Sequence, residues 1–327
     1  MKPYNKLASF IAIIFCSISL FANAQFRIVG YLNTWDDFPN NINQVNLTKI
    51  THLNIAFANP DAAGNLTTFS DISTVVDSAH AHHIKVSMSL GGGDLNGTKK
   101  NWQNLTRTSN VKSFCNKILK YLQSNNLDGV DIDLEGNIIG DNYANFIETL
   151  SNKLKPQNKI VTAAVATWFA NHIPASSFAY FDFVNIMSYD ATGPWNPNHA
   201  GPSAPYSMAV NDIIFWSRKG LAQNKMSLGV PFYGWGFYNK FSQNEYAFRE
   251  LVTTYPGAAN ADQISDTIYY NGIPTIKKKT RLAIDKASGI MIWQLTEDAS
   301  GNKSLLNAIY ETIYGARGEK ANVQNSN

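Results

Sequence analysis

The sequence predicts a single α/β domain, a (β/α)8 TIM barrel without a large α+β insertion. Eight short β-rich runs alternate with amphipathic segments along the chain. Several of these runs are nearly continuous Val, Ile, Leu, Phe and Ala, as expected of parallel strands that are covered by helices. A doubly wound open sheet is the alternative, and it is disfavoured because no glycine-rich dinucleotide-binding turn follows the first run.

The elements follow in order. The predicted strands span residues 27–32, 50–58, 84–90, 127–134, 159–166, 181–187, 225–230 and 289–295. A helical face from Val111 to Leu122 makes Cys115 a buried core thiol, and a second helix follows Asp141, which we expect to cap its start. Helices are also expected over 208–221 and 305–314. Between the last two strands there is room for one helix and a small hairpin near Asn271-Gly272.

The two ends of the chain lie outside the predicted barrel domain, residues 25–315. Residues 1–24 read as a signal peptide: Lys2 and Lys6 are followed by an apolar run and by Ala22-Asn23-Ala24, a small-x-small cleavage site. A membrane anchor fits less well because the apolar run is too short. We therefore expect cleavage after Ala24 and a secreted or periplasmic protein. Residues 316–327 read as a polar, frayed tail.

Composition narrows the class of function. The formal charge of +3 includes two signal-peptide lysines, so the mature chain carries about +1 (3 − 2). This charge gives no reason to expect binding to nucleic acid or to a membrane. Aromatic residues make up 12% of the chain, including seven Trp, which is compatible with sugar binding. We expect a monomer.

The most unusual run is "DGVDIDLE", residues 128–135, in which acids alternate with apolar residues. Residues two apart in a strand share a face, so Asp131, Asp133 and Glu135 should line the barrel lumen while the apolar set packs on helices. Glu135, nearest the carboxyl end of the strand, should be the most accessible. Neighbouring carboxylates raise each other's pKa, and a carboxyl group of this kind can protonate a leaving group.

The run 128–135 has two other structural interpretations, an edge strand and a metal site. A solvated edge strand is disfavoured by the apolar residues at every intervening position. A Mg²⁺ or Ca²⁺ site would need ligands from other strands, which supply few, so we expect no metal. Ordinary retaining glycosidases also need a carboxylate nucleophile. The seventh strand, "MSLGVPFYG", offers none at its end, so in a glycosidase the nucleophile would come from the substrate.

Several motifs together resemble glycoside hydrolase family 18, which contains chitinases and endo-β-N-acetylglucosaminidases. The run 128–135 fits the D-G-x-D-x-D-x-E strand of that family, 89–92 fits S-x-G-G, and 187–190 fits M-x-Y-D. "LGVPFYG" and "MIWQL" look like its seventh and eighth strands, and the resemblance spans the mature chain in barrel order. One departure is Trp235, where many chitinases carry Arg.

The resemblance implies roles for individual residues. Glu135 would be the general acid and base, Asp133 would orient the 2-acetamido group of the substrate, and Asp131 would share a proton with Asp133. Tyr189 and Asp190 would complete the catalytic group by contacting that sugar. The substrate-binding residues implied by the resemblance or by their place near the barrel mouth are Trp293, Tyr31, Ser89, Trp195, Tyr233 and Met187. Trp293 would be the hydrophobic floor, Tyr31 and Ser89 would hydrogen-bond the buried acids, and Asp128 would be structural.

The implied activity is hydrolysis of β-1,4-linked N-acetylglucosamine by a retaining, substrate-assisted mechanism without a cofactor. The expected partners are chitin or other N-acetylglucosamine-containing glycans. We expect an open groove and endo-type action. An endo-β-N-acetylglucosaminidase acting on N-glycans or cell-wall glycans, and a non-catalytic chitinase-like lectin, stay open as alternatives, although lectins of this kind lose the acid that Glu135 supplies.

Overall fold

The computed structural model describes residues 25–93, 97–237 and 244–324. The predicted signal peptide, residues 1–24, lies outside them. Among the described residues, no helix is both long and apolar enough to cross a membrane.

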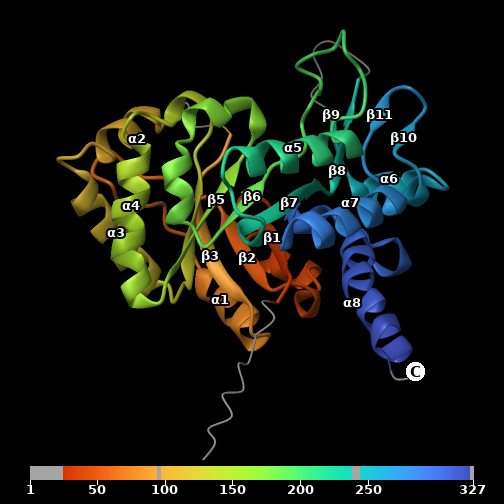
Figure 1. The fold of residues 1–327 in the computed structure, drawn as a ribbon, viewed down its shortest axis with the longest axis horizontal. Coiled ribbons are helices and arrows are strands. Elements are labelled where there is room, and N and C mark those ends of the chain that lie inside the picture. The colour runs from red at the N-terminus through yellow and green to blue at the C-terminus, as the bar shows by residue number, and fades with distance from the viewer. Residues whose placement is uncertain (1–24, 94–96, 238–243, 325–327) are drawn as a thin grey trace, which may run out of the picture.

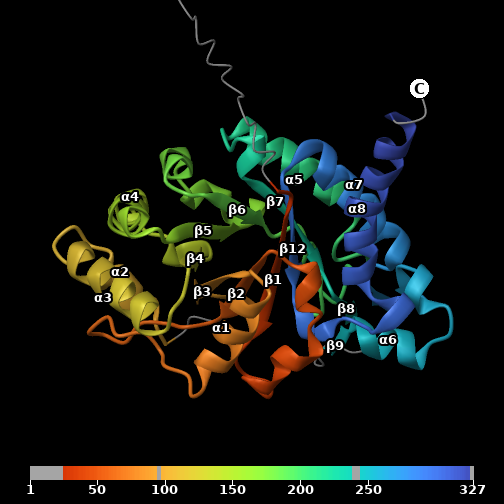
Figure 2. The ribbon, with the colours of Figure 1, turned by 90° about the horizontal axis from the view of Figure 1, so that it is seen from below.

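Parallel strands close into a barrel with the order β1-β12-β7-β6-β5-β4-β3-β2, and helices pack on its outside (Figures 1 and 2). The barrel strands are β1 Arg27–Asn33, β2 His52–Ala56, β3 Lys85–Gly91, β4 Gly129–Asp133, β5 Ile160–Val165, β6 Phe183–Ile186, β7 Met226–Pro231 and β12 Gly289–Trp293. Each lies within a predicted strand or within one residue of it. The predicted barrel is therefore confirmed.

The helices are less regular than a strict alternation predicts. They are α1 Ile72–Ala81, α2 Lys99–Leu105, α3 Val111–Ser124, α4 Tyr143–Leu154, α5 Tyr206–Arg218, α6 Phe248–Thr254, α7 Ile273–Lys286 and α8 Leu305–Gln324. Short 3-10 helices, not α-helices, connect β1 to β2 and β5 to β6. The residue before α4 is Asn142, not the predicted cap Asp141, and its side chain does not cap the helix. The α8 backbone runs to Gln324, into the segment where a frayed tail was expected.

The segment between β7 and β12 also differs in detail from its prediction. It forms a small four-stranded sheet with the order β10-β11-β8-β9, together with α6. The strands are β8 Tyr233–Gly236, β9 Asn244–Ala247, β10 Gln263–Ile264 and β11 Ile268–Tyr269. The expected small hairpin is present, but β10 and β11 form it with a turn at residues 265–267 and not at Asn271-Gly272. Gly272 directly precedes α7, and the Asn271 side chain is buried. Two-residue strands carry no periodicity that a sequence pattern could reveal.

Two apolar clusters hold the barrel together. The larger one fills the space between strands and helices and contains Val130 and Ile132 from β4, with Cys115 from α3. The smaller one fills the lumen and includes Val29, Tyr31, Phe183 and Met291. The lumen below the site is thus filled with side chains.

Candidate active site

Strand β4 presents its acids to the lumen as the period-two pattern predicts. Asp131 is fully buried and Asp133 is 3% exposed, whereas Glu135 lies just beyond the strand and is partly exposed. Val130 and Ile132 point the other way, into the cluster beneath the helices. Accessibility therefore increases along the strand toward its carboxyl end.

Four donors surround the deepest acid, Asp131. Its Oδ2 accepts hydrogen bonds from the Tyr31 hydroxyl at 2.6 Å and from Ser89 Oγ at 2.8 Å. Its Oδ1 accepts from Thr162 Oγ1 at 2.6 Å and from Asn185 Nδ2 at 3.4 Å. Burial raises the pKa of Asp131, and these four donors oppose that rise. Because all four groups donate, we place the negative charge on Asp131.

Asp133 has a different environment. Its Oδ1 is buried without a hydrogen-bond partner. Burial raises the pKa of Asp133 well above its ordinary value, and the charges of Glu135 and Asp131 raise it further. This asymmetry favours a protonated Asp133 above an ionised Asp131.

The general-acid candidate, Glu135, is poised for proton transfer near neutral pH. Burial raises the pKa of Glu135 to about 7, and the charge of Asp190 contributes to the rise. A carboxyl group with such a pKa is protonated often enough to act as an acid and ionised often enough to act as a base.

The end of β3 lies so close to its parallel neighbour β4 that only glycine fits there. A Cβ on Gly91 would lie 2.0 Å from the Asp133 carbonyl oxygen, and the residue has φ +123°. The next amide, Gly92 N, donates to that same oxygen at 2.8 Å. The glycines of the S-x-G-G motif thus fix the backbone that carries Asp133.

Asp190 lies across the site from β4, at the start of the loop after β6. Its Oδ1 accepts hydrogen bonds from the Tyr233 hydroxyl at 2.7 Å and from Trp235 Nε1 at 2.8 Å. Burial raises the pKa of Asp190, and these two donors oppose the rise. Tyr233 is 3% exposed, so the structure places it behind Asp190.

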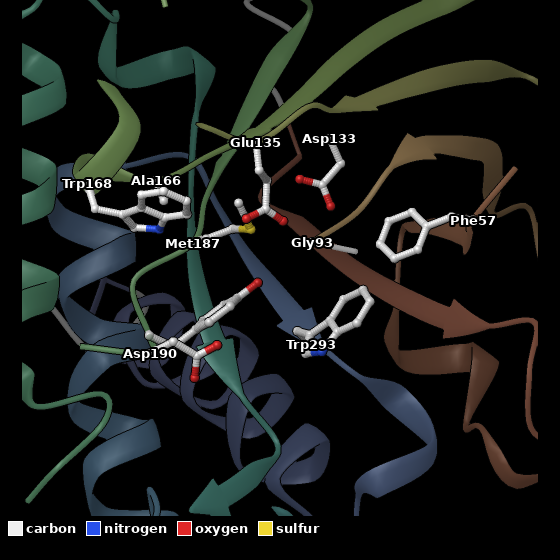
Figure 3. Close-up of a pocket in the computed structure, with 10 residues that line it drawn as sticks. Phe57, Gly93, Asp133, Glu135, Ala166, Trp168, Met187, Asp190 and Trp293 are labelled. Atoms are coloured by element: carbon white, nitrogen blue, oxygen red, sulfur yellow. The ribbon is translucent and has the colours of Figure 1, made fainter. Parts of the chain in front are cut away.

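The acids face a cavity of about 240 Å³ (Figure 3). Figure 3 shows the carboxyl groups of Asp133 and Glu135 directed into the space bordered by Trp168, Phe57 and Trp293. The lining residues are Phe57, Gly93, Asp133, Glu135, Ala166, Trp168, Met187, Tyr189, Asp190 and Trp293. This space combines carboxyl groups with aromatic faces, the combination that sugar rings require.

A second cavity, of about 820 Å³, shares Glu135 with the first. It lacks Asp133 and Trp293 and is lined in their place by Thr167, Trp195 and Met208, among others. The two cavities also share Trp168, Tyr189 and Asp190, so the second is continuous with the first and extends toward Trp195.

Aromatic rings flank the site. Trp293 stacks on Phe57 with ring centroids 5.5 Å apart, and Trp35, 54% exposed, lies 6.2 Å from Trp293. Trp168 and Trp195 are 71% and 55% exposed. Such exposed tryptophans at a cavity suit stacking on sugar rings.

Most of the predicted site residues come together here, but not all of them line a cavity. Trp293, Met187, Tyr189 and Trp195 do. Tyr31 and Ser89 are buried beneath it and hydrogen-bond Asp131 as expected. Tyr31 and Ser89 therefore support Asp131 and do not line the cavity where a substrate could bind. Tyr233 supports Asp190 in the same way.

Other residues of the site were missed or were only weak candidates. Thr162 and Asn185 were missed because a single polar residue in an apolar strand carries no pattern. Phe57, Gly93 and Trp35 were missed because their approach to β12 or β4 depends on barrel closure. Trp168 could have been found from one signal, an aromatic residue shortly after a predicted strand.

One expectation about a charged group outside the site can be compared with the structure. Asp128 lies at the opposite end of β4, where it accepts from His80 Nε2 and Lys85 Nζ, both at 2.8 Å, and from Val86 N at 2.9 Å. The structural role predicted for Asp128 agrees with these contacts. Among the residues that the structure describes, no group of three or more His, Cys, Asp and Glu could hold a metal ion.

Comparisons with known proteins agree with this geometry. A chitinase, ChiB, from the chitin utilization locus of Flavobacterium johnsoniae superposes with a TM-score of 0.83 at 39% identity, covering 88% of this chain and 94% of that one. A class V chitinase of Arabidopsis thaliana is 26% identical over 84% of this chain and 81% of its own length. A chitinase-like effector of Moniliophthora roreri is 29% identical over 73% of this chain. The match covers only 65% of the length of that effector.

The family can be assigned from these findings together. The sequence model of "Glycosyl hydrolases family 18" matches residues 27–298, nearly the whole described barrel. The matched region contains the acidic strand, the Asp190 loop and Trp293. The chain therefore belongs to the glycosyl hydrolases family 18.

Proposed function

We propose that this protein is a chitinase that cuts β-1,4 linkages between N-acetylglucosamine residues. The observation that carries the proposal is the arrangement around Glu135: a carboxyl group with a pKa of about 7 at the edge of an aromatic-lined cavity that also holds Asp133. The likeness to a Flavobacterium johnsoniae chitinase at 39% identity supports the same activity.

The proposed reaction proceeds in two steps with the substrate as its own nucleophile. The carbonyl oxygen of the 2-acetamido group attacks the anomeric carbon while the glycosidic bond breaks, and Glu135 gives its proton to the leaving oxygen. This forms an oxazolinium ion. Glu135, now a carboxylate, takes a proton from water as the water oxygen attacks the anomeric carbon and opens the ring, so that the configuration is retained.

The neighbouring acids support the charge that develops. Asp133 lies in the same cavity and can hydrogen-bond the acetamide N–H, while the ionised Asp131 below it stabilises the positive ring. Tyr189 and Asp190 line the opposite wall and are placed to contact the acetamido sugar. Trp293 forms the apolar floor for the ring.

We also propose that residues 1–24 direct export and are removed, because they combine a basic start, an apolar run and a small-x-small site. Amino-terminal sequencing of the protein from the culture medium tests this directly. A mature chain that begins at Gln25 is expected, and retention of Met1 would contradict it.

The decisive experiment for the activity compares chitohexaose with a high-mannose glycopeptide, using the wild type and Glu135→Gln. We expect hydrolysis of chitohexaose and a loss of at least about 100-fold in the variant. Cleavage of the glycopeptide alone would assign an endo-β-N-acetylglucosaminidase, and binding without cleavage would assign a lectin. Undiminished activity of Glu135→Gln would refute the proposed role of that residue.

A further inference from the structure

Helix α7 carries a lysine that has no part in the proposed chemistry and is completely buried. Lys279 is 0% exposed. Its Nζ donates to the carbonyl oxygen of Ala204 and to Asn271 Oδ1, both at 2.8 Å. Burying an ammonium group is costly unless it is hydrogen-bonded, so the position invites a functional explanation.

The contacts of Lys279 converge on the end of one loop. The Ala204 carbonyl oxygen also accepts from Asn271 Nδ2 at 3.0 Å, so two buried side chains hold one backbone group. One residue earlier, the Ser203 carbonyl oxygen accepts from Ala191 N at 2.8 Å, which closes residues 191–203 into a loop between β6 and α5. Lys279 and Asn271 thus anchor the base of this loop, which we call the Trp195 loop.

The Trp195 loop forms one wall of the larger cavity. Trp195 lines that cavity and lies edge-on to Trp235, with centroids 5.2 Å apart. Trp235 in turn donates to Asp190. The cavity shares Glu135, Tyr189 and Asp190 with the acidic space but lacks Asp133 and Trp293, so it continues from the proposed acid toward Trp195. Further sugars of a glycan chain would bind there.

The charge of Lys279 is balanced from two neighbouring elements. Burial lowers the pKa of Lys279 to about 7, and the negative charges of Asp262 and Asp212 oppose this fall. Asp212 lies on α5 and accepts from Thr167 Oγ1 at 2.6 Å, and Thr167 lines the same cavity. The base of the wall therefore contains buried, hydrogen-bonded polar groups as well as apolar packing.

We propose that Lys279, together with Asn271, is a positioning residue that fixes the Trp195 loop as a binding wall for the glycan sugars that lie beyond the acidic cavity. This inference rests on the proposed function, because it assumes that Glu135 cuts a glycan chain bound across both cavities. Neither residue touches substrate. Both act through the Ala204 carbonyl group and the loop that it ends.

The test measures the hydrolysis of chitohexaose by Lys279→Met, Asn271→Ala and the matched control Lys277→Met, which changes a partly exposed lysine of the same helix. We expect Lys279→Met to raise KM about tenfold, equivalent to about 1.4 kcal/mol of binding, and to leave kcat within about twofold. Lys277→Met should change neither constant. If Lys279→Met does not fold, Asn271→Ala tests the same anchor, because it removes the second donor to Ala204.

A double-mutant comparison separates positioning from a general loss of stability. If Lys279 acts through the loop, Lys279→Met should add little to the KM effect of Trp195→Ala, whereas independent effects would multiply. An unchanged KM in Lys279→Met, or multiplied effects, would overturn the proposal while leaving hydrolysis by the wild type intact. If the wild type binds chitohexaose without cutting it, the proposed function fails, and the same comparison made on dissociation constants still tests the anchor.

Discussion

Replacing Thr162 by Val tests the charge assigned to the deepest acid. Thr162 is fully buried, and its hydroxyl donates to Asp131 Oδ1 at 2.6 Å. This distance falls within the range of about 2.5–2.7 Å that is typical of a hydroxyl bound to a carboxylate. A hydrogen bond to a charged group contributes about 1.5–3 kcal/mol, so Thr162→Val should lower the free energy of unfolding by about that amount.

The matched control is Thr280→Val. Thr280 is also fully buried, but its hydroxyl donates to the neutral carbonyl oxygen of Ile276 at 2.8 Å. A bond to a neutral acceptor contributes about 0.5–1.5 kcal/mol, so this variant should lose less. Urea unfolding at pH 7 measures both. A loss in Thr162→Val no larger than that in Thr280→Val would refute an ionised Asp131.

The pH dependence of this loss gives a second criterion. The Thr162 bond favours the ionised form of Asp131, whose pKa burial raises above its ordinary value. The extra loss in Thr162→Val should therefore be full above the folded-state pKa of Asp131 and shrink as the pH falls through it. A loss that is constant with pH would contradict the assignment.

Three further predictions follow from the site and the core. Because burial raises the pKa of Glu135 to about 7, kcat/KM should fall as the pH rises through about 7, which a pH–rate profile measures. The folded protein binds the Glu135 proton more tightly than the unfolded chain, so this proton contributes stability that is full below about pH 4.5 and is lost as the pH rises to about 7. Thermal unfolding should show this loss in the wild type but not in Glu135→Gln. Trp293→Ala should raise KM for chitohexaose about tenfold, and Trp293→Phe, which keeps a ring face, should raise it less; equal effects would contradict stacking. Cys115 is 1% exposed and burial raises the pKa of its thiol to about 12, so a thiol reagent should label it only in denaturant, and labelling of the native protein would contradict its burial.

The sequence was sufficient to predict the barrel and the placement of the acids. Strands that are buried on both faces are nearly continuous apolar runs, and the only run that carries several acids must turn them away from the helices. Asp131, Asp133 and Glu135 therefore lie where period two predicts, at increasing accessibility.

The sequence was not sufficient to predict which groups surround those acids. Thr162 and Asn185 come from β5 and β6, and their contact with Asp131 depends on strand stagger around the barrel. The direction of proton transfer within the acidic cluster depends on those donors. In the same way, Asn271 was read as part of a turn because Asn-Gly favours turns, but its side chain is drawn inward by the Ala204 carbonyl group.

The closure of the barrel by β12 has a consequence for the order in which the parts of the site are synthesised. Glu135 directly follows β4, which is made before the middle of synthesis, whereas Trp293 ends β12, the last strand of the barrel. Strand β12 completes the ring between β7 and β1. A chain that ends before β12 can therefore hold Glu135 but not Trp293. The two sides of the cavity come together only when the last barrel strand has been made.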